Sequence, residues 1–168
     1  GSDRLPAIAP AERTLHDYAF TGLSLREHPM AFLRDRLTRR RVIPAADLRS
    51  AQRCPAGRRL RVAGVVLVRQ RPGTASGVVF ITLEDETGIA NLIVWSDRYE
   101  RCRRIIRLSR CLMVEGLVQR EGEVVHVLAE RFRGLDDQLP GLESISVYFK
   151  FRRANDFVDL MSFDLFLL

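Results

Sequence analysis

The feature that most constrains this chain is a change in its hydrophobic period near residue 60. Downstream of Leu60, apolar residues recur at every second position, which is typical of β-strands, whereas upstream they recur at helical spacing. This pattern predicts five strands, over residues 60–69, 78–84, 89–95, 111–119 and 124–132, and a helix between the third and the fourth. Gly64 lies inside the first strand, where glycine weakens the strand unless the backbone bends sharply.

Three strands, a helix and two further strands follow the order of a five-stranded OB-fold barrel. Short helices are predicted upstream, over 12–20, 29–40 and 45–53, and capping-box spacing occurs at 24–27 and 97–100. The sequence thus predicts a mainly β fold with flanking helices. The expected segments are a cloning scar at residues 1–2, where Gly-Ser stands in place of Met, a helical linker at 3–57, the OB-fold domain at 58–133 and a C-terminal tail at 134–168 with a strand pattern and an apolar helical face.

Charge and composition narrow the class of partner. The net charge is +6, with ten Arg against two Asp over residues 34–61 and six Arg against one Glu over 98–110. Such clustering favours a polyanionic partner, although solvated arginine faces would give the same composition. No apolar run is long enough to span a membrane, so no membrane partner is expected. Three cysteines without a paired motif argue against a disulfide framework or zinc site, and a reducing cytoplasm is the expected compartment.

Several motifs resemble one known family. Residues 60–66 (LRVAGVV), 80–88 (FITLEDETG) and 114–122 (VEGLVQREG), with 17–30 upstream, are similar to the OB domain of bacterial C-family DNA polymerase III alpha-type subunits and the linker before it. The sequences of these motifs are more similar to the error-prone paralogue of the damage-induced mutasome than to the replicative enzyme. The resemblance covers about residues 12–133 and implies a parent DNA polymerase. The family's palm carboxylates and phosphoesterase-like domain are absent from this sequence, so no catalytic site is expected.

The barrel pattern places candidate binding residues on one face. OB barrels bind single strands across strands two and three, and parity puts Phe80 and Asn91 on the outside. Stacking on aromatic rings and salt-dependent phosphate contacts would give binding that is indifferent to sequence. The candidate contacts are Arg61, Arg69 and Arg71, which are expected to border one side, Phe80, Thr82, Asn91 and Trp95 on the strands, and Arg98 and Arg101 on the helix. In the alternative, Phe80 closes the barrel end or packs under the amino-terminal helices, Trp95 plugs the core and some arginines are solvated.

Catalysis and cofactors have little support. His16, His28 and His126 are too scattered for a metal site, and Glu84 to Glu86 occupy a hairpin turn, where acidic residues are favoured for backbone reasons. No cofactor or metal is expected. In the tail, Phe163, Asp164, Leu165 and Phe166 distantly resemble a sliding-clamp-binding peptide. The alternative is that the tail packs on its own barrel or on another copy.

Three functions remain open at this stage. The leading hypothesis is a non-catalytic module that binds or positions single-stranded template DNA for an error-prone DNA polymerase in translesion synthesis. The second is protein docking, which recruits mutasome accessory proteins or the sliding clamp. The third is RNA reading, because residues 80–83 and 88–91 also resemble the anticodon-binding domain of class II tRNA synthetases; the upstream segment 17–30 argues against it.

Overall fold

The first strand of the barrel changes partner halfway along its length. The computed structural model describes residues 28–139, in which β1 (Arg59–Gln70) pairs antiparallel with β4 (Cys111–Glu121) over its first half and with β2 (Val79–Asp85) over its second. The switch occurs at Val65, which faces Cys111 on one side and Glu84 on the other. Glycine is needed beside this switch, because a Cβ on Gly64 would lie 2.6 Å from the carbonyl oxygen of Glu84; the structure thus shows a close backbone approach where a bend was predicted.

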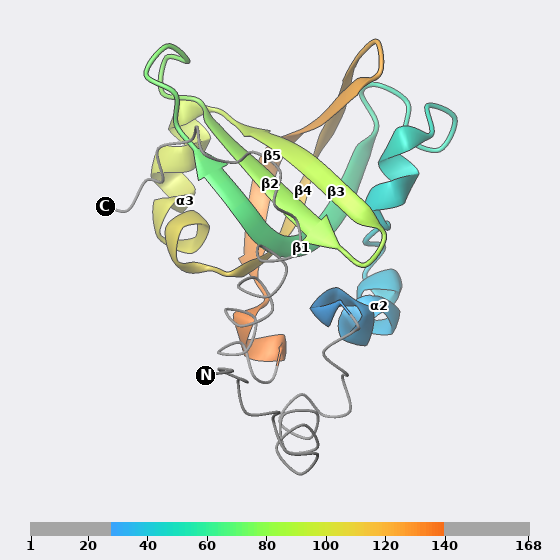
Figure 1. Cartoon of the computed structure of the whole chain (residues 1–168). Coiled ribbons are helices and arrows are strands. Elements are labelled where there is room, and N and C mark those ends of the chain that lie inside the picture. The colour runs from blue at the N-terminus through green and yellow to red at the C-terminus, as the bar shows by residue number, and fades with distance from the viewer. Residues whose placement is uncertain (1–27, 140–168) are drawn as a thin grey trace, which may run out of the picture.

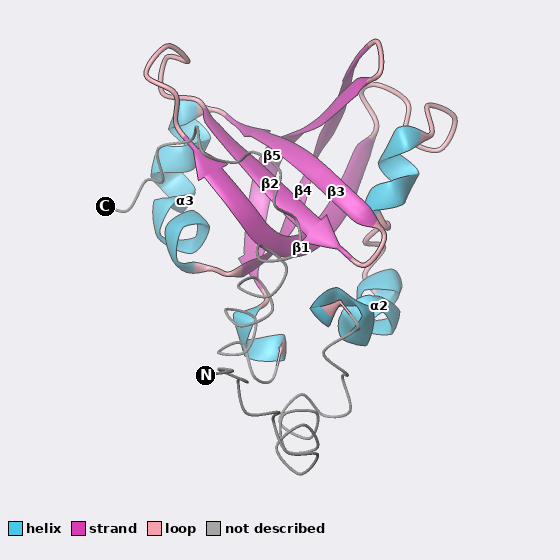
Figure 2. Ribbon diagram, in the orientation of Figure 1, coloured by secondary structure: helices cyan, strands magenta, loops and turns pink. Residues whose placement is uncertain are grey.

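The five strands close into a barrel in the order β1-β2-β3-β5-β4 (Figure 1). Strand β3 (Gly88–Val94) pairs antiparallel with β2, and β5 (Val124–Gly134) pairs antiparallel with β4. The seam between β3 and β5 is parallel and has only two residue pairs, Leu92 with Val127 and Ile93 with Leu128. Helix α3 (Ser96–Leu108) connects β3 to β4 (Figure 2). The predicted OB-fold barrel is therefore confirmed, with strand ends displaced by one or two residues.

The flanking elements differ in detail from those expected from the sequence. Helix α2 (Pro29–Arg39) matches its prediction, but residues 45–53 form only a short 3-10 helix, η1 (Ala45–Arg49), and η2 (Asp136–Gln138) follows β5. His28, not a serine, caps α2, because its Nδ1 accepts a hydrogen bond of 3.1 Å from the amide of Met30. The expected cap of α3 at 97–100 is wrong: the capping residue is Trp95, and its side chain makes no capping hydrogen bond. The helix expected at 12–20 and the capping box at 24–27 lie outside the described residues.

Two apolar clusters hold the fold together. The barrel interior is filled by alternate residues of all five strands, and Ile106 of α3 closes one end. A second cluster packs α2 against the outside of β1 and β4, with Met30, Leu33 and Leu37 fully buried. Cys54 and Cys111 are buried free thiols, and burial raises both their pKa values, so they stay protonated. None of the helices within residues 28–139 is long and apolar enough to cross a membrane.

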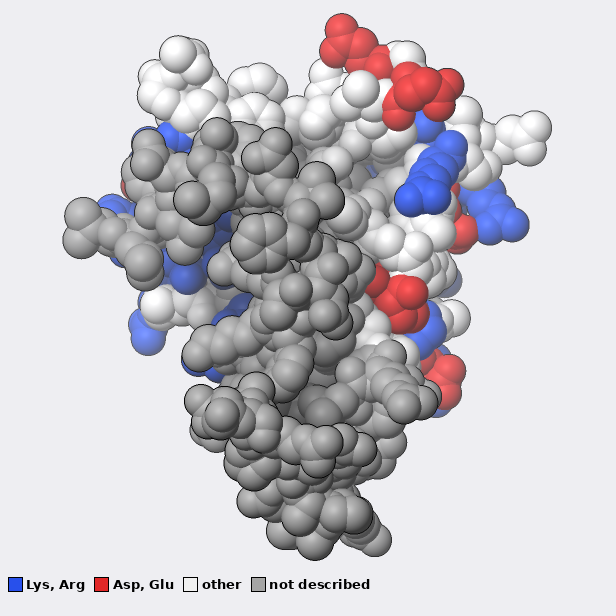
Figure 3. All heavy atoms as spheres, in the orientation of Figure 1, with Lys and Arg blue, Asp and Glu red and all other residues white. Residues whose placement is uncertain are grey.

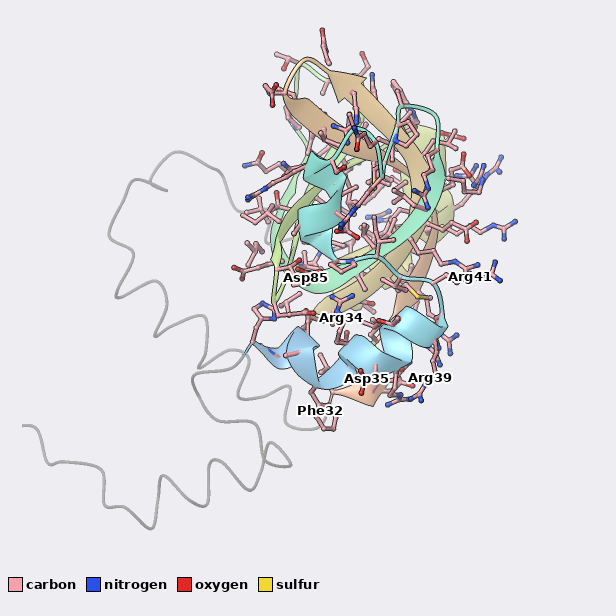
Figure 4. All side chains as sticks on the ribbon, turned by 90° about the vertical axis from the view of Figure 1, so that its right-hand side faces the viewer. Phe32, Arg34, Asp35, Arg39, Arg41 and Asp85 are labelled. Carbon is pink, nitrogen blue, oxygen red and sulfur yellow. The ribbon has the colours of Figure 1, made fainter. Side chains whose placement is uncertain are left out.

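A buried carboxylate fixes α2 and η1 to the turn between β2 and β3. Asp85 is fully buried and accepts hydrogen bonds from the amides of Ala45 (2.8 Å), Thr87 (2.7 Å) and Gly88 (3.0 Å). The guanidinium of Arg34 reaches across from α2, 2.9 Å from Asp85 and in contact with Glu86 (Figure 4). Burial opposes the charged form of Arg34, but its hydrogen bonds to Glu86 and Asp85 outweigh this and raise its pKa. The turn carboxylates thus bind an arginine as well as shaping their own turn.

The C-terminal end of α2 has a Schellman motif with an arginine in the left-handed position. The amide of Val42 donates to the carbonyl of Leu37 (3.0 Å) and that of Arg41 to the carbonyl of Thr38 (2.9 Å). Val42 and Leu37 also meet in the second apolar cluster, a contact that frequently accompanies this motif. Arg41 has φ +58°, a conformation that glycine adopts without steric cost and arginine does not.

We expect Gly64→Ala to destabilise the chain by about 1–3 kcal/mol, because the new methyl group would collide with the backbone of Glu84 rather than with a flexible side chain. Urea denaturation followed by circular dichroism measures the change. Gly73→Ala is the matched control, since a Cβ there meets nothing within 4 Å. Equal stability of the two variants would contradict the close approach of β1 and β2.

We expect Arg34→Met to destabilise the chain by about 2–3 kcal/mol, because the buried carboxylate of Asp85 would lose its cationic partner. Arg36→Met is the control on the same helix: Arg36 is exposed and forms no ion pair among the described residues. Denaturation curves of both variants separate the two cases. A loss of stability no larger than that of the control would show that the contact contributes nothing.

Candidate nucleic-acid interface

The outer face of β2 and β3 carries a mixture of aromatic, polar and aliphatic side chains. Phe80 lies opposite Ile93 and is half-buried, and Thr82 lies opposite Asn91, to whose side-chain oxygen its hydroxyl donates a hydrogen bond of 3.2 Å. The alternate residues are buried on the inner face: Val79, Ile81 and Leu83 on β2, and Ala90, Leu92 and Val94 on β3. The parity expected from the sequence is therefore correct for both strands.

Trp95 continues this face beyond the end of β3. It has the same parity as Ile93 and Asn91, and it is 54% exposed. Its backbone is extended (φ −63°, ψ 149°), and its carbonyl oxygen accepts a hydrogen bond of 2.8 Å from the amide of Tyr99, which begins α3. The alternative that Trp95 plugs the core is wrong, because a core side chain would be buried.

Arg71 is held beside the first turn of α3. Its guanidinium carbon lies 5.3 Å from the centroid of the Tyr99 ring, and its Nη2 lies 3.7 Å from Oε1 of Glu100. The loop that returns to β2 comes back past it, since a Cβ on Gly77 would lie 3.3 Å from Arg71 Nη2 and 3.2 Å from the Cβ of Ser96. Ser96 follows Trp95 directly in the sequence. The exposed indole of Trp95 and the guanidinium of Arg71 therefore lie at the same end of the barrel.

Contrary to the prediction, Arg69 does not lie on the β2–β3 face. A bulge between Val66 and Val68 shifts the register, so that Arg69 lies opposite buried Ile81 instead of opposite an outward-facing residue. Its guanidinium donates to the carbonyl of Ile106 (2.7 Å) and to that of Ser109 at the end of α3. Burial lowers the pKa of Arg69, and the negative charge of Asp136 partly opposes this.

Arg61 lies on another side of the barrel. It faces Glu115 of β4, and its Nε lies 2.7 Å from the Glu115 carboxylate. Its Nη1 donates to the carbonyl of Arg40 at 3.0 Å. The expectation that Arg61, Arg69 and Arg71 border one side is therefore wrong, and only Arg71 is brought to the β2–β3 face.

Charged side chains of α3 and the neighbouring strands determine the electrostatics of this end of the barrel. Arg98 is half-buried and Arg101 exposed, both in the first two turns of α3. A hydrogen bond from Arg59 lowers the pKa of Glu130 on β5, and the positive charge of Arg98 adds to this effect. In Figure 3, basic side chains are visible beside α3 and on the opposite side of the barrel, whereas acidic ones gather at the tip of the β4–β5 hairpin. An anionic ligand is thus favoured at the α3 end.

Sequence reasoning missed two members of this surface. Tyr99 was not among the predicted contacts, yet its ring supports Arg71. Ile93 supplies the apolar neighbour of Phe80, which could have been found from strand parity alone. Within residues 28–139, no group of three or more His, Cys, Asp or Glu is arranged to hold a metal ion. The clamp-like peptide Phe163–Phe166 lies outside the described residues.

Comparisons with known proteins give a family model and several similar proteins. The family model described as an OB-fold nucleic acid binding domain matches residues 60–135. An error-prone DNA polymerase of Caulobacter vibrioides is 50% identical over 82% of this chain, and one of Azoarcus sp. is 52% identical over 84%. The chain spans only 12% and 13% of the length of these two relatives. A crystal structure of asparaginyl-tRNA synthetase from Pyrococcus horikoshii overlaps 56% of this chain and 22% of its own, with 22% identity and a TM-score of 0.47.

We expect Arg69→Gln to destabilise the chain by about 1–2 kcal/mol, because it removes a cation and two hydrogen bonds from the C-terminal end of α3. Arg107→Gln, which removes an exposed cation from the last turn of the same helix, is the control and should cost less. Thermal unfolding compares the two. The structural role would be refuted by an Arg69→Gln chain as stable as the control.

Proposed function

This chain belongs, as an OB-domain region, to the error-prone DNA polymerases, and we propose that it binds single-stranded nucleic acid across the outer face of β2 and β3. The observation that carries the proposal is the exposure of Trp95 beside a positioned arginine. The indole of Trp95 is 54% exposed at the end of the β2–β3 face, so it offers a stacking surface to an unpaired base.

The face offers two aromatic platforms at a useful separation. Phe80 lies opposite Ile93, and Trp95 follows two residues after Ile93, just beyond the end of β3, so the two aromatic residues are diagonal neighbours about 7–8 Å apart. Two bases of an unpaired strand can therefore use separate rings. Thr82 and Asn91 provide hydrogen-bonding groups next to them, but too few to read a sequence, so binding is expected to tolerate any base.

The phosphates of the bound strand would lie toward α3. Arg71 is fixed between Tyr99 and Glu100, and Arg98 and Arg101 follow on the helix. The acidic tip of the β4–β5 hairpin, with exposed Glu121 and Glu123, disfavours a path in that direction. Arg71, Arg98 and Arg101 are therefore the cations of this site, and Arg61 and Arg69 are not needed for it.

In the parent polymerase we assign this face to the unpaired template strand during translesion synthesis. The chain itself would contribute no catalytic group, because the paired carboxylates Asp85 and Glu86 are engaged with Arg34 rather than displayed to a substrate. Stacking without sequence readout suits a template that contains damaged bases. Equal titrations with tRNA and single-stranded DNA test the alternative of an RNA reader, which a strong preference for tRNA would favour.

The sequence contains a single Trp, so intrinsic fluorescence reports on the site directly. We expect an oligothymidine of about 12 nucleotides, within the site size of an OB fold, to quench Trp95 emission at low salt and less at high salt. Labelled-oligonucleotide anisotropy should show that Trp95→Ala and Phe80→Ala each cost roughly 1–3 kcal/mol of binding.

Leu108→Ala is the matched control for these variants. Leu108 is also apolar and 69% exposed, but it lies at the far end of α3, so its loss should leave affinity unchanged. The proposal fails if the chain does not bind the oligonucleotide even in dilute salt. It also fails if Trp95→Ala and Phe80→Ala bind as tightly as the Leu108→Ala chain.

A further inference from the structure

A second group of arginines lies away from the β2–β3 face, where the end of α2 meets β1, β4 and β5. We define the α2-end surface as Arg39, Arg41, Arg59, Arg61 and Arg131. Contacts between elements place these residues together. The carbonyl of Arg40 accepts from Arg61, Val42 bridges to Arg61, and Arg61, Glu115 and Arg131 lie opposite one another on three adjacent strands.

The carboxylates among these arginines do not balance them. Glu115 lies 2.7 Å from Arg61, 3.7 Å from Arg59 and 3.9 Å from Arg131, and Glu130 contacts Arg59 as well. Two carboxylates thus share three guanidinium groups. Arg39 and Arg41 add two exposed guanidinium groups and Asp35, one turn before Arg39 on α2, adds one exposed carboxylate, so five arginines face three carboxylates. The side chain of Arg131 is 79% exposed, so the excess positive charge is available at the surface.

Arg41 is the residue that the fold itself does not explain. Its backbone is in the left-handed conformation, at the position of the Schellman motif where glycine is the favoured residue. Its side chain is exposed and makes no hydrogen bond or ion pair with any part of the chain that the structure describes. A cation at either Arg39 or Arg41 suits the negative end of the α2 dipole, but at Arg41 any residue other than glycine carries a conformational cost.

We propose that the α2-end surface binds the phosphate backbone of double-stranded nucleic acid. Figure 4 shows Arg39 and Arg41 at the same end of α2, on the side away from Arg34 and Asp85. A duplex, with its higher charge density, is the better ligand for such a surface. The single-strand face and the α2-end surface could then hold the unpaired and paired parts of one template.

The decisive experiment compares Arg41→Gly with Arg41→Gln in the full 168-residue chain. Both remove the guanidinium, but only glycine also removes the backbone cost. We expect both to weaken binding of a fluorescein-labelled DNA duplex about fivefold to tenfold at ~0.1 M salt and to lower the salt slope by about 0.9. Arg41→Gly should also raise the thermal midpoint, by about 2–5 °C, whereas Arg41→Gln should not.

Two controls give this experiment a single meaning. Arg104→Gln removes one exposed cation from α3 and should leave duplex binding unchanged. Oligothymidine quenching of Trp95 should be the same in the Arg41 variants as in the original chain. Failure of the duplex-binding proposal can then be distinguished from failure of the single-strand site. Unaltered duplex affinity in both Arg41 variants would overturn the proposal, as would complete displacement of duplex by oligothymidine.

Discussion

The barrel depends on the close approach of β1 to the backbone of β2 at Gly64. Because the glycine has no side chain, β1 can leave β4 and join β2 within a single residue, at Val65. Both faces of the molecule follow from this crossing. The second half of β1 aligns β2 and β3 so that Phe80, Ile93 and Trp95 face outward, and the first half presents Arg59 and Arg61 beside β4 and α2.

Arginine has two physically different uses in this chain, and net charge does not separate them. Arg34, Arg69 and Arg120 act as multidentate donors inside the fold: Arg34 to carboxylates, Arg69 to the end of α3, and Arg120 to the carbonyls of Cys54 and Leu48. Their guanidinium groups are already hydrogen-bonded within the protein. The side chains of Arg41, Arg71 and Arg131 are exposed, and these are the groups that can attract a polyanion.

Much of the architecture could be predicted from sequence, because it depends on local period. The alternation of buried and exposed residues in β2 and β3 gave the correct face for Phe80 and Asn91, and Gly64 marked the close approach of β1 to β2. The site was predicted less well, because it depends on register. A bulge between Val66 and Val68 turns Arg69 toward α3, and no local pattern marks it. The contact of Arg34 with Asp85 joins residues 51 positions apart, which periodicity cannot reveal.

The many hydrogen bonds that converge on Asp85 have a mechanical consequence. One carboxylate joins α2 through Arg34, η1 through Ala45 and the β2–β3 turn through Thr87 and Gly88. We therefore expect α2, η1 and the β2–β3 turn to move together as one rigid unit. A rotation of α2 would move the tip of the β2–β3 hairpin with it and would shift Phe80, the aromatic residue of that hairpin.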